Sequence, residues 1–181
     1  MFVVKFSLVE FHDIDKFFKR MYNKNIGVPR KGEIMIITFS GHSTLHYTDE
    51  LLKKIENAIQ NNTDEKEKII FYCGGMGDFD RACAKACLKI KEKRSNCELL
   101  LVTPYINFKN LDNSIYDGTI YPPLENVPLK FAIVKRNQWM IKNADFLIAY
   151  VNHSYGGAYN CLKYAQKLNK RIINLADALE K

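Results

Sequence analysis

The chain has 181 residues, of which 47% are hydrophobic and 26% are charged, and its formal net charge is +7. This length is enough for one domain with a sizeable core, and the composition is ordinary for a soluble globular protein. No apolar run reaches the roughly 18–20 residues that a membrane helix needs. The amino-terminal stretch has no small-residue cleavage site, so we expect no signal peptide, no membrane contact and a cytoplasmic location.

Residues 1–33 are predicted to form a strand (2–11) and a helix (13–24) that extend the main domain, residues 34–181. The first buried strand is predicted at 33–41, and a helix for which Thr48 is the expected N-cap follows it. A second buried strand at 68–73 leads through a glycine turn into a helix that ends near Lys93. A third strand at 97–105 is closed by Pro104.

The stretch 106–128 is dense in Asn, Asp, Gly and Pro, and predicts a long loop or lid. A helix at 129–144, a strand at 145–151, a second glycine turn with its helix at 154–170 and a final strand at 171–175 complete the pattern. Alternation of helices with continuously apolar strands predicts a single Rossmann-like α/β domain, a parallel sheet with helices on both faces. Asp145, at the amino end of its strand, is expected to be structural.

The five cysteines are odd in number and contain no CxxC pair. We interpret them as core residues, and no group of His, Cys and Asp has the spacing of a metal site. The excess of positive charge permits an anionic partner such as a nucleotide or a nucleic acid. Many lysines, however, fall in stretches that are typical of solvated helix ends and loops.

Two glycine turns follow predicted strands, GGMGDFD at 74–80 and SYGGAYN at 154–160. Ligands of open parallel sheets bind outside the carboxyl ends of the strands, and a helix N-terminus favours phosphate. Glycine would also serve a tight turn without any ligand. The two turns together favour a phosphorylated ligand, and neither has the spacing of a dinucleotide fingerprint or a Walker loop.

Single residues at this edge carry alternative interpretations. Asp78 and Asp80 either cap the helix or bind ribose hydroxyls. His42 either contacts the ligand as an acid–base group or bonds to the backbone. Tyr155 is the preferred residue for stacking on a base, whereas Trp139 is expected to pack in the core. The predicted ligand-binding residues are Gly41, His42, Ser43, Thr44, Gly74, Gly75, Met76, Gly77, Asp78, Tyr155, Gly156, Gly157, Ala158, Tyr159 and Asn160.

The segments TFSGHS, FYCGGMGDFDRACAKACLKIK, LLLVTPY, RNQWMIKNADFLIAYV and YGGAYNCLKYAQKLNKRIINL occur in the order found in the SLOG superfamily, named after the Smf/DprA and Lonely Guy proteins. Over residues 34–176 the chain resembles its YpsA-like branch. The resemblance implies a Rossmann-like fold that binds a nucleotide or nucleotide-derived molecule, with no cofactor, and a homodimer. It leaves three functions open: a sensor or sequestering protein, an N-glycosidase acting on nucleoside 5'-monophosphates, or a DprA-like binder of single-stranded nucleic acid.

The chain departs from the resembled families at two places. Arg136 and Met140 keep the spacing of an arginine and a methionine in Lonely Guy enzymes, but their catalytic glutamate has no equivalent after the second glycine turn. Hydrolysis would therefore need Arg136 to grip the phosphate and Asp78 or Asp80 to supply the carboxylate. Ser43 stands where the YpsA-like pattern usually has arginine.

Overall fold

The computed structural model describes residues 34–46, 48–106 and 113–176. The predicted extension at 1–33 and part of the predicted loop at 106–128 lie outside the described residues. Within the described ranges, no helix combines the length and the apolar character needed to cross a membrane.

The described elements alternate between strands and helices along the chain. In order they are β1 (Ile34–Gly41), α2 (Asp49–Gln60), β2 (Lys68–Cys73), α3 (Asp78–Lys93), β3 (Cys97–Val102), a short 3-10 turn η1 (Asn113–Ile115), β4 (Gly118–Ile120), α4 (Leu129–Asn143), β5 (Phe146–Tyr150), α5 (Gly156–Lys167) and β6 (Arg171–Asn174).

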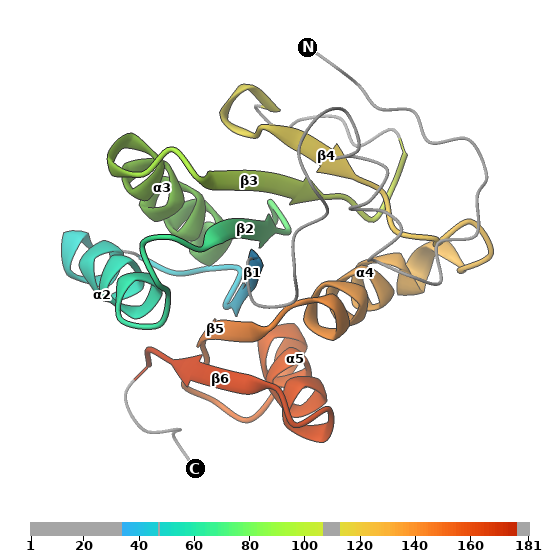
Figure 1. Cartoon of the computed structure of the whole chain (residues 1–181). Helices are drawn as coiled ribbons and strands as arrows, with labels where there is room; N and C mark the ends of the chain where they lie inside the picture. Colours follow the sequence, from blue (N-terminus) through green and yellow to red (C-terminus); the bar gives the residue numbers. More distant parts are fainter. Residues whose placement is uncertain (1–33, 47, 107–112, 177–181) are drawn as a thin grey trace.

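The six strands form one sheet in the order β4-β3-β2-β1-β5-β6, and all five neighbouring pairs are parallel. Helices α2 and α3 cover one face and α4 and α5 the other, with β4 and β6 at the two edges (Figure 1). The predicted Rossmann-like α/β fold is confirmed. The chain moves outward from β1 to β4, and α4 then returns it to β5 on the other side of β1. The topological switch point, where ligands of such sheets bind, therefore lies between β1 and β5.

The central strands are buried on both faces because helices cover each side. Ile37 and Phe71 pack with α2 and α3, whereas Ile70 and Tyr72 point to the side of α4. Each such side chain stabilises the fold by about 1.5–3 kcal/mol through removal from water. The ring of Trp139 lies 5.6 Å from that of Tyr72 and packs onto this second cluster, as predicted.

Several local predictions are also confirmed. The Thr48 side chain accepts a hydrogen bond from the Leu51 N–H at the start of α2, 3.4 Å away. Asp145 accepts from the Ile36 N–H at 2.7 Å, which places it at the amino ends of the strands. All five cysteines are buried and free.

The prediction of a long loop or lid with one helical turn at 106–128 agrees with the 3-10 turn η1, but it is wrong at Gly118–Ile120, where the chain forms β4. This strand has three residues and pairs with the end of β3. The Asp117 carboxylate accepts from the Leu99 N–H at 2.6 Å, and the Asp117 N–H donates to the Leu99 carbonyl at 2.9 Å. The strand thus depends on contacts with β3 that its own short sequence does not signal.

Candidate functional site

The candidate site lies at the carboxyl rim, by which we mean residues 41–46, 74–80 and 151–160, which end or follow β1, β2 and β5. The two glycine turns share this rim but flank β1 on opposite sides. The first turn is packed against neighbouring parts of the chain, whereas the second has open space around its glycines.

The first glycine turn is closely packed against neighbouring chain. Gly77 has φ +108°, and a Cβ there would lie 2.7 Å from the Ser43 Cα. The next amide, that of Asp78, donates to the Ser43 carbonyl at 2.9 Å. A Cβ on Gly74 would lie 2.5 Å from Arg136 Nη1. Gly74 and Gly77 therefore allow Arg136 and Ser43 to pack closely against this turn.

Arg136 occupies the space beneath that turn. Its side chain is 2% exposed, and its Nη1 donates to the carbonyls of Gly74 at 2.6 Å and Val102 at 2.7 Å. Its Nη2 lies 3.3 Å from the Met76 sulfur, and its Nε has no hydrogen-bond partner among the described residues. The guanidinium thus links α4 to the ends of β2 and β3. Binding of a phosphate by Arg136 stays a prediction.

The two acids of the first turn bond to nearby backbone amides. Asp80 accepts from the Met76 N–H at 2.8 Å, and Asp78 accepts from the Leu45 N–H at 3.0 Å. Asp78 also pairs with Arg81. Burial raises the pKa of Asp80 to about 6, although the Arg136 charge and the Met76 N–H oppose this shift. Asp80 therefore titrates close to neutrality, which is the range of a general acid or base.

The second glycine turn is open. Gly156 has φ +84°, and a Cβ added at Gly156 or Gly157 would meet no atom within 4 Å. Helix α5 starts here with no acidic residue in its first turn and no side chain capping it. Because the first N–H groups of a helix have no partner within the helix, this end is suited to an anion.

A stack of three rings lies between β1 and this open turn. The rings of His42 and His153 are stacked, with centroids 3.8 Å apart and planes at 11°, and the His153 and Tyr155 centroids are 4.1 Å apart. Tyr155, at the outer end, is 70% exposed. A planar group such as a nucleobase can extend a stack of this kind.

The inner end of the stack is fixed by a backbone hydrogen bond. His42 Nε2 accepts from the Asn152 N–H at 3.3 Å. Burial lowers the pKa of His42, and the neighbouring His153 lowers it further. The neutral ring therefore carries its proton on Nδ1, and the backbone interpretation of His42 is realised in the structure.

The rim thus gathers the predicted residues in two groups. The group between β1 and β5 comprises His42, Tyr155, Gly156 and Gly157, together with the exposed Asn160, the half-buried Tyr159 and the buried Ala158. The group at β2 comprises Gly74, Gly75, Met76, Gly77 and Asp78. Gly41, Ser43 and Thr44 lie in the β1 segment. The sequence makes His153, just before the second glycine turn, a weaker candidate than His42, and the predicted ligand-binding residues do not include it. Within the described residues, no group of three or more His, Cys, Asp or Glu is placed to hold a metal ion.

No protein-family model matches the chain. The uncharacterized SPbeta prophage-derived protein YoqJ of Bacillus subtilis strain 168 is 27% identical over 148 residues, covering 68% of this chain and 82% of its own. Among solved structures, DNA processing protein A (DprA) from Helicobacter pylori, described with a single-stranded DNA binding mode, gives a TM-score of 0.57 at 16% identity over 81% of this chain and 67% of its own.

DprA from Streptococcus pneumoniae gives a TM-score of 0.55 at 19% identity. The match covers 77% of this chain and 49% of the DprA chain. TM1055 gives 0.50 at 13% identity, covering 76% of this chain and 72% of its own. At these identities the likeness shows a shared fold.

Proposed function

We propose that the protein binds a nucleotide or nucleotide-derived small molecule between the carboxyl ends of β1 and β5, as a sensor or sequestering protein. The observation that carries the proposal is the uncapped start of α5 at Gly156 and Gly157, directly beside the exposed ring of Tyr155. The helix end favours a phosphate and the ring favours a base, and a nucleotide supplies both. Arg136 and Ser43 pack against the first glycine turn, so the proposed ligand contacts the second turn.

The SLOG resemblance and the fold shared with DprA support a ligand of the nucleotide class. Membership of the YpsA-like branch, the homodimer and the cytoplasmic location stay predictions.

A thermal-shift panel of AMP, ADP, ADP-ribose and cyclic AMP tests the proposal. At one hundred times its Kd, a ligand stabilises the folded state by about 2.7 kcal/mol, or roughly 5–10 °C for a chain of this size. Gly157→Asp places a negative charge in open space, so the variant should fold and lose the shift. The neutral Gly157→Asn variant is the control and should keep most of it. A flat panel for the native protein would overturn the proposal.

The N-glycosidase remains the second candidate because Asp80 titrates near pH 6 and lies close to Arg136. A carboxyl with this pKa can exchange a proton at neutral pH. Incubation with nucleoside 5'-monophosphates of several bases, followed by chromatography for free base, tests this activity. Release by the native protein and none by Asp80→Asn would support the enzyme, and no release from any of them would exclude it for these substrates.

A further inference from the structure

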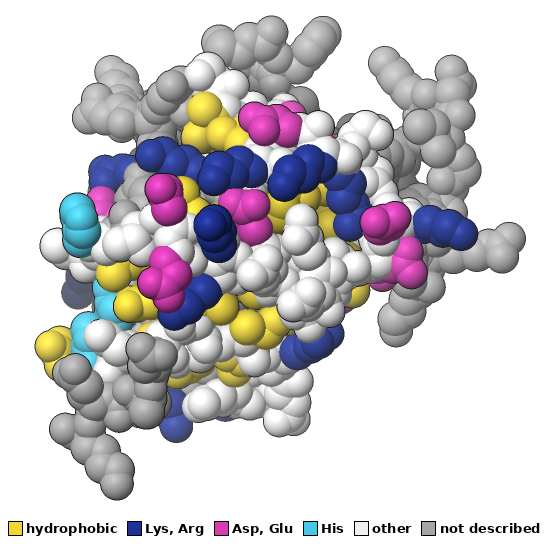
Figure 2. Space-filling view, turned by 90° about the vertical axis from the view of Figure 1, so that its left-hand side faces the viewer, with side chains coloured by type: hydrophobic (Ala, Val, Ile, Leu, Met, Phe, Trp, Pro, Cys, Tyr) yellow, Lys and Arg dark blue, Asp and Glu magenta, His cyan; other side chains and the backbone are white. Residues whose placement is uncertain are grey.

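Arg136 is a buried cation, which sets it apart from the basic side chains at the surface. Over the face formed by α2 and α3, basic and acidic side chains are interspersed (Figure 2), and Arg81 there pairs with Asp78. Arg136, on α4, is 2% exposed and belongs to no ion pair within the described ranges. The cost of burying its charge therefore depends on the hydrogen-bond acceptors around it.

These acceptors do not use the full hydrogen-bonding capacity of the guanidinium. Nη1 donates to two backbone carbonyls, but Nη2 donates to the sulfur of Met76 at 3.3 Å. In the part of the chain that the structure describes, Nη2 has no oxygen partner and Nε has no partner at all. A thioether sulfur is a weak acceptor, whereas a guanidinium forms strong hydrogen bonds with oxygen. An oxygen atom at this position would therefore suit Nη2 better than the sulfur.

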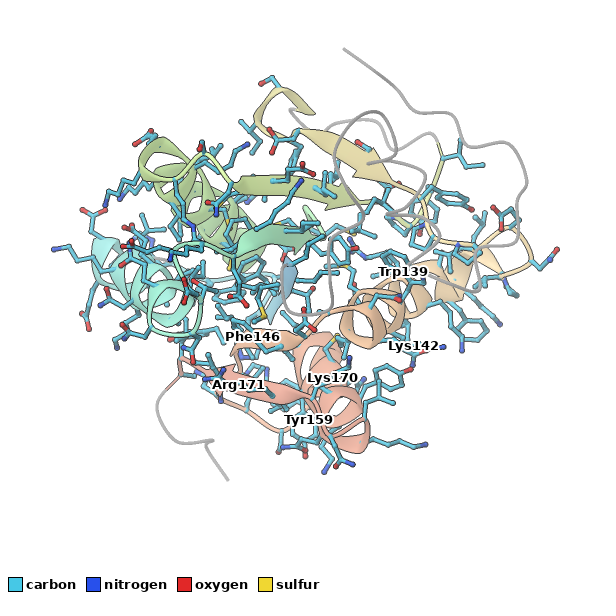
Figure 3. All side chains as sticks on the ribbon, in the orientation of Figure 1. Trp139, Lys142, Phe146, Tyr159, Lys170 and Arg171 are labelled. Carbon is cyan, nitrogen blue, oxygen red and sulfur yellow. The ribbon has the colours of Figure 1, made fainter. Side chains whose placement is uncertain are left out.

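The sulfur that contacts Arg136 belongs to a side chain that reaches solvent. Met76 is 36% exposed, whereas Met140 is 2% exposed and Met35 is half-buried. Figure 3 shows Trp139 on the side of α4 that faces the sheet, and it packs there against the cluster that contains Met140. Among the methionines that the structure describes, Met76 is therefore the one most open to a dissolved oxidant.

We propose that Met76 is a modification site: a peroxide oxidises its thioether to the sulfoxide, and Arg136 holds the new oxygen. In this step the O–O bond of the peroxide breaks, and an S=O bond forms on a free lone pair of the sulfur. The sulfur loses two electrons, the peroxide gains them, and hydrogen peroxide leaves as water. Rotation about the Cγ–Sδ bond then turns the oxygen to Nη2, which donates to it in place of the sulfur.

Oxidation adds a contact between α4 and the first glycine turn. The Gly74 carbonyl of this turn already accepts from Arg136, and the Met76 N–H donates to Asp80 at 2.8 Å. A hydrogen bond from a charged donor to oxygen is roughly twice as strong as a neutral one. Because sulfoxide reductases restore the thioether, the modification is reversible. This contact does not depend on the nucleotide site proposed at the second glycine turn.

The first measurement follows oxidation of the native full-length protein in dilute hydrogen peroxide by peptide mass mapping. Trypsin releases Met76 in residues 69–81 and Met140 in residues 137–142, each as the single methionine of its peptide. Met76 should gain oxygen at least about tenfold faster than Met140, because oxidation follows exposure. Fragment ions distinguish the methionines from Cys73 and Trp139 in the same peptides. Similar rates for the two methionines would overturn the proposal.

The second measurement tests whether Arg136 receives the oxygen. Methionine oxidation usually disrupts packing. Here peroxide should shift the Tm of the native protein upward by about 2–4 °C relative to the shift in Met76→Leu, which cannot form the sulfoxide at this position. Treatment with sulfoxide reductases should remove the difference. An equal or more negative shift in the native protein would contradict the role of Arg136.

A variant gives the same information without an oxidant. The amide oxygen of Met76→Gln imitates the sulfoxide oxygen, so this variant should melt about 2–4 °C above Met76→Leu. Leu168→Gln is the matched control, because Leu168 has a similar exposure of 37% and lies at the end of α5. It should give no rise in Tm over the native protein. Equal stability of Met76→Gln and Met76→Leu would overturn the proposal.

Discussion

Gly74 and Gly157 lie at the same rim, but only Gly157 has room for a side chain. A methyl group on Gly74 would lie 2.5 Å from Arg136 Nη1 and 3.0 Å from an Asp80 oxygen, whereas one on Gly157 meets nothing within 4 Å. Gly74→Ala should lower the free energy of unfolding by about 2–3 kcal/mol, and Gly157→Ala by less than about 0.5 kcal/mol. Urea denaturation measures both, and equal effects would show that the first turn is not packed as described.

His42 should make stability depend on pH. Its folded-state pKa lies below the ordinary value of 6.5, because burial and His153 disfavour the charged ring. The neutral ring accepts from the Asn152 N–H, and the protonated ring cannot. Its contribution is therefore fully present above pH 6.5 and is lost as the pH falls through the lower folded-state value.

The free energy of unfolding measured between pH 7.5 and 5 checks this expectation. His42→Gln cannot titrate and should give a flatter dependence than the native protein. An unchanged slope in His42→Gln would contradict the assignment.

At the scale of elements, Arg136 fastens α4 to the ends of β2 and β3. Arg136→Met would leave the carbonyls of Gly74 and Val102 without this donor and Asp80 without its opposing cation. Loss of one partner from a buried charged network costs about 3–5 kcal/mol. Lys135→Met, on the exposed side of the same helix, should change stability by less than about 0.5 kcal/mol. Thermal or urea unfolding distinguishes them, and a fully stable Arg136→Met would contradict this role.

The elements that the sequence predicted share a local signal. Strands β1, β2, β3 and β5 are continuous apolar runs, and α4 and α5 have helical spacing, so burial by neighbouring layers was readable from the residues. Strand β4 has no such run, since Gly118 and Thr119 give it little apolar surface. Its position depends on Asp117 and on pairing with β3, which are contacts between segments separated in sequence.

In the candidate site, too, the features with a local sequence signal were predicted, and those that depend on contacts between distant segments were not. Both glycine turns, His42 and Tyr155 were predicted, because glycines and polar residues after buried strands mark the carboxyl edge of a sheet. The filling of the first turn was not, because Arg136 and Gly74 are 62 residues apart. Nor was the contact of His42 with His153, which depends on β1 and β5 being neighbours.

At the scale of the whole molecule, the two helical layers contribute differently to the carboxyl rim. Its first turn, at Gly156 and Gly157, opens on the rim, and Lys163 and Lys167 continue along its exposed side. The opposite layer, α2 and α3, carries ion-paired charges and closes the first glycine turn through the start of α3. The fold thus leaves the start of α5 open at the rim and packs the start of α3 against the β1 segment.

The most direct test of the nucleotide site is a titration of the isotopically labelled protein, followed by the backbone amide signals in NMR. With the nucleotide that gives the largest thermal shift, the signals of Tyr155, Gly156 and Gly157 should move saturably, and those of Gly74 should move little. Changes centred on the first glycine turn, or scattered over the surface without saturation, would contradict the account.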